Sequence, residues 1–136
     1  MKEPASEGSE SNIATPETTI NDVETLPYRL GFEETPNLVY LRGRIVVAVR
    51  EGDIDDLQRA LNGYINIAEV LATETGNAAP QVGLIIAQAL IWREASEPKK
   101  YLRAISDALE YADNMGFDDA VTILRRELDA GSNGES

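Results

Sequence analysis

Histidine and cysteine carry much of the acid–base, metal and nucleophilic chemistry of small proteins, and this sequence contains neither residue. Without His the chain lacks the commonest general base and the commonest transition-metal ligand. Without Cys it can form no disulfide, thiolate metal site or cysteine nucleophile. Ser, Asp, Glu, Lys and Tyr remain available, so an enzyme stays possible. We nevertheless expect no catalytic residue set, no metal site and no cofactor.

Three aspartates, Asp53, Asp55 and Asp56, resemble the start of a calcium-binding loop. Such a loop needs glycine at its sixth position and glutamate at its twelfth, where this chain has Gln58 and Tyr64. The same aspartates suit the first turn of a helix, where the helix dipole favours negative charge. We therefore expect them to cap a helix beginning near residue 54 and to bind no calcium.

Basic residues are concentrated in one short stretch of the chain. The stretch comprises Arg93, Lys99, Lys100 and Arg103. Both of its lysines fall in the first turn of an expected helix, where positive charge is mildly unfavourable, which makes the group a candidate binding site for an acidic partner. The alternatives are occupation by the chain's own acidic tail and a merely solvated helix face, of which the solvated face is favoured.

A second candidate for partner binding is the apolar segment 26–32, in which Leu26, Tyr28, Leu30 and Phe32 alternate with other residues. Alternation with a period of two is typical of an extended strand. The segment is expected either to lie over the core as an arm, which is favoured, or to serve as a short recognition motif through Tyr28, Leu30 and Phe32.

The composition predicts one acidic domain in a chain of 136 residues with a formal net charge of −12. This charge disfavours unaided binding to nucleic acid or anionic lipid. The polar, acidic start has no signal-peptide pattern, and the longest apolar run is too short for a membrane span, so we expect a cytoplasmic protein. The expected organisation is a disordered acidic tail at 1–25, an extended arm at 26–35, a helical domain at 36–130 and a flexible tail at 131–136.

The remainder of the chain contains signals for the starts and ends of helices, such as Thr35-Pro36 for a start and Gly52 for an end. The segment 36–50 is expected to be helical, although its β-branched residues leave a strand pair as an alternative. A seam of apolar residues spaced as in a heptad runs through the next helix, at Ile54, Leu57, Leu61, Tyr64, Ala68 and Leu71. The run 82–92 is apolar on nearly every face, so it must be surrounded.

Together these patterns predict an all-α fold, a five-helix antiparallel bundle with the packing of helical hairpins. Its last two helices resemble a tetratricopeptide hairpin at Ala108, Tyr111, Ala120 and Leu124. The resemblance covers one hairpin without a second copy at the period of about 34 residues, so no repeat family is assigned.

For function, the sequence favours a non-enzymatic module for protein–protein interaction, an adaptor, regulator or immunity-type binder that also self-associates as a homodimer. The enclosed run 82–92 motivates self-association, with Tyr64, Leu71, Ile85 and Trp92 as candidate contacts. One alternative is an acidic inhibitor that mimics nucleic acid. Another is a small ligand-binding or enzymatic bundle with a pocket near Trp92, Tyr101 and Tyr111. The expected partner is a protein, with no nucleic acid and no membrane.

Overall fold

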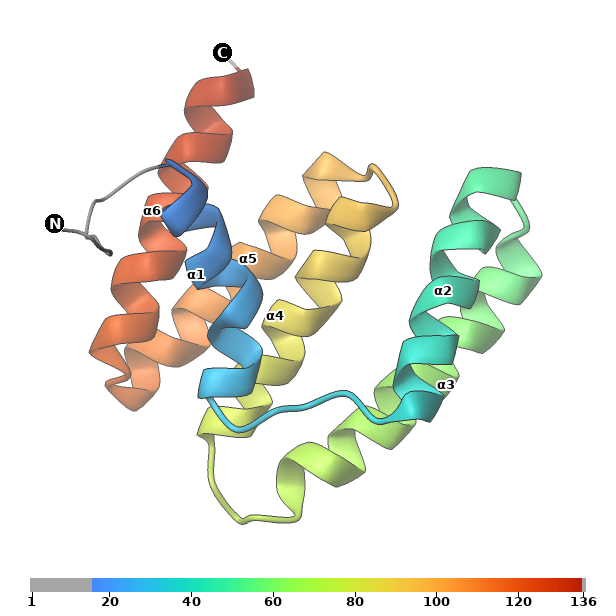
Figure 1. Cartoon of the computed structure of the whole chain (residues 1–136), viewed down its shortest axis with the longest axis horizontal. Coiled ribbons are helices and arrows are strands. Elements are labelled where there is room, and N and C mark those ends of the chain that lie inside the picture. Colours follow the sequence, from blue (N-terminus) through green and yellow to red (C-terminus); the bar gives the residue numbers. More distant parts are fainter. Residues whose placement is uncertain (1–15, 136) are drawn as a thin grey trace, which may run out of the picture.

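A computed structural model of the chain describes residues 16–135, with side chains over 23–131. Within that part the fold is all-helical and contains six helices (Figure 1). They are α1 (Pro16–Arg29), α2 (Pro36–Glu51), α3 (Ile54–Thr73), α4 (Ala79–Glu94), α5 (Pro98–Met115) and α6 (Asp118–Glu135). Segment 36–50 is therefore helix and not a strand pair. The expected all-α class is confirmed, and the expected count of five helices is one too few.

Helix α4 lies at the middle of the molecule, with α2 and α3 on one side and α5 and α6 on the other (Figure 1). It contributes to two apolar cores. Val82, Ile86 and Ala89 pack with α1, α5 and α6, whereas Leu84 and Ile91 pack with α2 and α3. A helix that faces two cores needs apolar residues around its circumference, which explains the run 82–92. The chain's own helices surround it, so no second subunit is needed to cover α4.

The extra helix, α1, corrects two expectations, since residues 16–25 had been assigned to a disordered tail and 26–29 to an extended arm. Val23, Leu26 and Leu30 follow helical spacing, and α1 turns this face toward α4 and α6. Leu26 and Leu30 satisfy a period of two as well as a helical period, which explains the error. Tyr28 distinguishes a helix from an extended strand, because a helix turns its side chain outward, and that side chain is exposed. Residues 1–15, the rest of the expected tail, lie outside the described residues.

The expected flexible tail at 131–136 is also helical as far as Glu135, where α6 ends. Gly131 lies against Leu102 of α5, so closely that an added Cβ would be 2.5 Å from Leu102 Cδ2. Glycine at this position serves close helix packing, and the sequence pattern had suggested flexibility instead. Ser136 lies outside the described residues.

The buried stripe of α3 coincides with the expected heptad seam at Tyr64 and Ala68 and differs from it elsewhere. Its most deeply buried residues are Ala60, Tyr64, Ala68 and Ala72, spaced by four. Leu57, Leu61 and Leu71 are only partly buried beside them, and Ile54 faces solvent. Alanines let α3 approach its neighbours closely, so the larger leucines lie at the margins of the contact.

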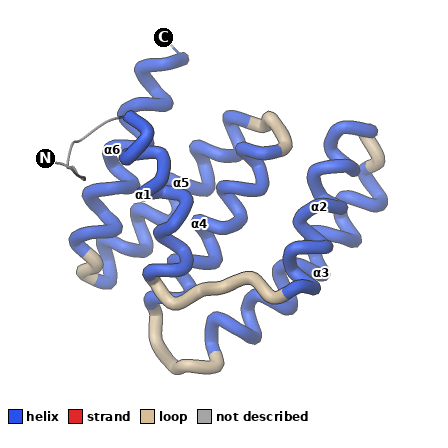
Figure 2. The backbone as a smooth tube through the Cα atoms, in the orientation of Figure 1, coloured by secondary structure: helices blue, strands red, loops and turns tan. Residues whose placement is uncertain are grey.

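Loops between consecutive helices are short, except for the connections from α1 to α2 and from α3 to α4 (Figure 2). The first of these connections is anchored by Phe32, which is buried against α4. It is anchored again by Glu34, whose carboxylate accepts a hydrogen bond from the hydroxyl of Tyr64 at 2.6 Å and pairs with Arg42 at 3.4 Å. The connection therefore holds the hairpin formed by α2 and α3 in a fixed place.

Candidate docking surface on the α2–α3 hairpin

The ends of α2 and α3 are fixed by local signals that the sequence predicted. Thr35 caps α2 by accepting a hydrogen bond from the backbone N–H of Leu38, and Gly52 ends the helix with a positive φ of 70°. Asp53 caps α3 by accepting from the backbone N–H of Asp56 at 3.1 Å. Because caps and stop leave only a two-residue turn, α2 and α3 form a tight hairpin.

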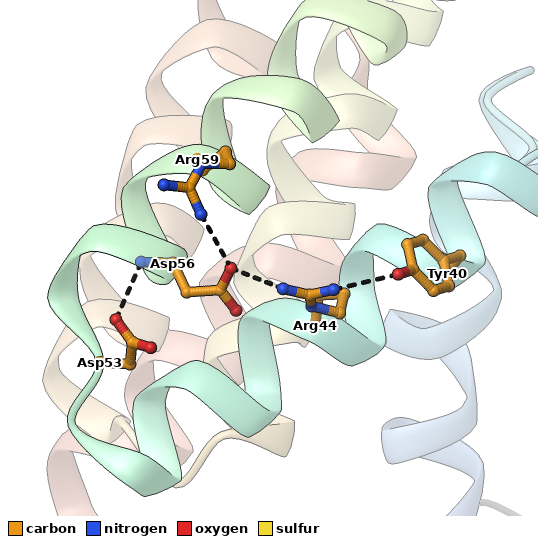
Figure 3. Close-up of polar contacts among 5 residues, drawn as sticks. All are labelled: Tyr40, Arg44, Asp53, Asp56 and Arg59. Carbon is orange, nitrogen blue, oxygen red and sulfur yellow. Dashed lines mark hydrogen bonds and ion pairs between the residues drawn. The ribbon is translucent and has the colours of Figure 1, made fainter.

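A polar cluster joins the two helices of the hairpin on the solvent side (Figure 3). Arg44 of α2 donates to the carboxylate of Asp56 at 2.6 Å and to the hydroxyl of Tyr40 at 3.0 Å. Arg59 adds a second contact with Asp56 at 3.3 Å. The hydrogen bond from Arg44 is the main cause of a lowered pKa of the Asp56 carboxyl group. These charges satisfy one another, so the cluster positions α2 against α3 and has no reactive group.

Large apolar side chains face solvent on the same hairpin. Exposed fractions are 46% for Val39, 62% for Tyr40, 46% for Val47 and 66% for Ile54. In the described part of the chain only Tyr28, Val70 and Met115 are comparable, and they lie apart on α1, α3 and α5. Exposed apolar side chains gathered on one side of a helix are a mark of a protein contact, whereas single exposed residues are ordinary. We call the surface of Val39, Tyr40, Gly43 and Val47 the α2 face.

A groove of about 660 Å³ lies between α3, α4 and α5. Its lining comprises Asn66, Glu69, Val70, Ala72, Thr73, Gln81, Leu84, Ile85 and Tyr111. The hydroxyl of Tyr111 donates to the side-chain oxygen of Gln81 at 2.5 Å, which ties α5 to α4 at the rim. The expected pocket thus includes Tyr111 but neither Trp92 nor Tyr101.

Two of the four basic residues near the α4–α5 turn, Arg93 and Lys100, have partners within the chain. Arg93 pairs with Glu24 of α1 at 2.7 Å and lies over the ring of Tyr101. Glu24 belongs to the segment 1–25. The acidic group that binds Arg93 therefore comes from the chain's own N-terminal region. The ammonium of Lys100 lies 4.7 Å from the ring centre of Trp92. Lys99 and Arg103 are exposed on α5.

The fold places the side chains of the apolar segment 26–32 in different environments. Phe32 is buried in the core beside α4 and Leu30 is partly buried, so these two serve packing. Tyr28 alone stays open to a partner. Because a recognition motif would need all three side chains at the surface, the fold does not bring them together as one site.

The expected self-association residues are also dispersed. Tyr64 is fully buried and offers no surface to a second copy. Leu71 and Trp92 are partly buried against the α2–α3 core, and Ile85 lines the groove. The α2 face was not predicted, because a few apolar residues on the outer side of a short helix do not by themselves indicate a binding surface. Its signal is Val39, Gly43 and Val47 at intervals of four, apart from the residues of α2 that the structure buries, such as Leu38 and Ile45.

Among residues 23–131, no group of three acidic, His or Cys side chains is placed to hold a metal ion. None of the described helices is both long and apolar enough to cross a membrane. No family model matches the sequence, and no curated protein or solved structure matches it significantly.

Proposed function

We propose that this chain is a non-enzymatic protein–protein interaction module that binds its partner through the α2 face. The observation that carries the proposal is the exposure of Val39, Tyr40 and Val47 together on one helix, with Ile54 also exposed at the start of α3. Covering apolar side chains stabilises a complex by roughly 25 cal/mol per Å² of area removed from water. The face stands on a hairpin braced by Arg44 and Asp56, so little conformational freedom would be lost on binding.

Capture of a partner from an extract of the native host tests this proposal. The full chain would serve as bait beside Val47→Glu, which places a charge within the α2 face. Val70→Glu is the matched control, because Val70 is likewise exposed but lies on α3, where it lines the groove facing α4 and α5. We expect one set of captured proteins that the Val47→Glu bait loses and the Val70→Glu bait keeps. Equal capture by all three baits would contradict the proposal.

The location that we propose is the cytoplasm, where an adaptor or regulator without cysteine would need no oxidising compartment to fold. Fractionation of host cells with an antibody against the chain would test this. Recovery in a membrane or secreted fraction would refute it.

A second candidate function is binding of a small molecule in the groove between α3, α4 and α5. The specific observation is its size, about 660 Å³, which is in the range of ligand sites, with apolar Leu84 and Ile85 beside polar Gln81. Glu69 is the one charged residue of the lining, so an amine with an apolar body is the matching ligand. Chemical-shift changes on addition of hexylamine, lost in Glu69→Gln, would support this function. Unchanged spectra would remove it.

The alternative of nucleic-acid mimicry gains little from the described surface. A mimic needs unpaired acids at regular spacing, whereas Asp56 is engaged by Arg44 and Arg59. Helix α2 itself carries three arginines and one glutamate. Asp56 and the arginines of α2 therefore lend no support to this alternative.

A further inference from the structure

A second hollow adjoins the groove between α3, α4 and α5. Its volume is about 320 Å³, and it shares Tyr111 with the groove. The rest of its lining comes from α5 and comprises Asp107, Glu110, Asn114 and Met115. Among the described helices, α3 and α5 lie on different sides of α4 and do not pack on each other (Figure 1). Groove and hollow form one depression, which we call the trench, with α3 and α5 as its walls and α4 as its floor.

Both walls and the floor of the trench offer apolar side chains. Leu84 and Ile85 line the floor. Val70 on the α3 wall is 60% exposed, and Met115 on the α5 wall is 49% exposed. The lining residues of α3 fall within 66–73, which span about 10 Å, or two turns of helix. The trench therefore suits an elongated occupant with an apolar side.

Every charged residue that lines the trench is acidic. Glu69 is on the α3 wall, and Asp107 and Glu110 are on the α5 wall. All three are exposed, and within residues 23–131 none of them forms an ion pair. Carboxylates on both walls favour an occupant that carries positive charge at more than one point. A single small amine does not meet that requirement.

The helices that line the trench supply no positive charge along it. Residues 60–92, which include most of α3 and α4, contain no lysine or arginine, and neither do residues 104–115 of α5. The nearest base along α5 is Arg103, one turn before Asp107, and these two side chains are not joined by an ion pair. The negative charge of the walls is therefore not neutralised from within these helices.

Helix α1 does not supply a base to the trench either. It packs against Gly83 of α4, where an added Cβ would lie 3.1 Å from the carbonyl oxygen of Pro27. Two residues along a helix correspond to a rotation of about 200°, so Gly83 faces away from Gln81 and Ile85, which line the trench. Arg29, at the end of α1, therefore lies across α4 from the trench.

The chain itself is a poor source of a basic occupant. Residues 1–15 contain Lys2 as their only base, beside Glu3, Glu7 and Glu10. A second copy of the chain brings a net charge of −12 and is repelled as a whole. The charge of the trench is thus matched by a different protein, one with a basic segment.

We propose that the trench binds a basic amphipathic helix of a partner protein. The apolar side of that helix covers Leu84 and Ile85, and its lysines or arginines face Glu69 on one wall and Asp107 on the other. Laying the apolar side of a helix into a groove is a recurring mode of recognition. The contact is independent of the α2 face, and it is an alternative to the small amine considered above for the groove.

Titration of the full chain with a model peptide tests this proposal. The peptide has about 14 residues, enough to form a helix, with leucines along one side and lysines flanking them. At about 0.15 M salt we expect binding that shifts the backbone resonances of residues 66–73, 81–85 and 107–115. Replacing the lysines by glutamate, or the leucines by serine, should each weaken binding about tenfold or more. Shifts spread evenly over the molecule would overturn the proposal.

Charge reversal separates the trench from general attraction between a basic peptide and an acidic protein. Glu69→Lys combined with Asp107→Lys should raise the dissociation constant about tenfold or more. Glu51→Lys combined with Asp129→Lys is the matched control, because it changes the net charge equally at exposed residues outside the trench. We expect that control to raise the constant by about threefold or less. Circular dichroism melts verify that both variants fold. Equal weakening by the two variants would overturn the proposal.

Two small amines distinguish the other occupants. Spermine carries several positive charges without apolar side chains, so displacement of the peptide by an equal concentration of spermine would overturn the amphipathic helix. Shifts with hexylamine but not with the peptide would leave the groove to the small-molecule function and overturn this proposal. Unchanged spectra with all three would remove both. None of these results bears on the capture experiment with Val47→Glu, which tests the α2 face separately.

Discussion

The hydroxyl of Tyr64, buried in α3, donates a hydrogen bond to the carboxylate of Glu34, which lies 2.6 Å away in the connection before α2. Replacing the donor by Tyr64→Phe leaves a partly buried carboxylate with one partner fewer. We expect the free energy of unfolding to fall by about 1.5–3 kcal/mol, because the acceptor is charged. Urea unfolding followed by circular dichroism measures this change. Tyr40→Phe, at an exposed tyrosine, is the control and should change stability by about 0.5 kcal/mol or less. Equal effects of the two changes would contradict the expectation.

Alkaline pH should destabilise the fold through two tyrosines. Burial, helped by hydrogen bonds to Glu34 and Glu127, raises the pKa of Tyr64 and of Tyr101 above the ordinary value. A raised pKa contributes stability that is complete below the unfolded value of about 10 and is lost as pH rises above it. Urea midpoints measured between pH 9 and 11.5 should therefore fall. The Tyr64→Phe, Tyr101→Phe double variant should show a shallower decline, and an identical slope would contradict this assignment.

Two glycines should respond to the same substitution with opposite signs. Gly83→Ala forces a Cβ to within 2.8 Å of Phe32 Cβ and 3.1 Å of the carbonyl oxygen of Pro27, so the end of α1 must shift. We expect a loss of about 1–3 kcal/mol. Gly43→Ala meets nothing and improves helix propensity, so we expect a gain of up to about 1 kcal/mol in dilute, monomeric protein. Thermal melts of the two variants provide the comparison, and shifts of the same sign would refute it.

Acid should weaken the hairpin through Asp56. The hydrogen bond from Arg44 lowers the pKa of this carboxyl group, so its contribution is present above the unfolded value of about 3.9 and is lost as pH falls through the folded value. Asp56→Asn removes that contribution at neutral pH. The urea midpoints of wild type and Asp56→Asn should differ at pH 6 and converge near pH 2. A constant difference over this range would exclude Asp56 as the titrating group.

Much of the fold follows from local signals in the sequence. Thr35, Asp53 and Gly116 mark helix ends because capping chemistry acts within three or four residues. The enclosed position of α4 follows from the absence of a polar face. Such features need no knowledge of the neighbours.

Features that depend on the neighbours were not predictable in the same way. The apolar residues of α1 fit two periods, and only the exposure of Tyr28 shows which one the fold uses. The alanines of α3 are buried more deeply than its leucines because close contact selects for small size. The role of Gly43 depends on what surrounds it. A glycine packed against another element and a glycine in open space look alike in sequence.

The position of α4 has a consequence for how the protein unfolds. Since α4 contributes side chains to both cores, the α2–α3 hairpin cannot detach without exposing one side of α4, nor can α5 and α6 detach without exposing the other. Partial openings are therefore penalised from either direction. The amide protons of α4 should exchange with solvent only when the whole domain opens, and heating should melt both halves in one transition.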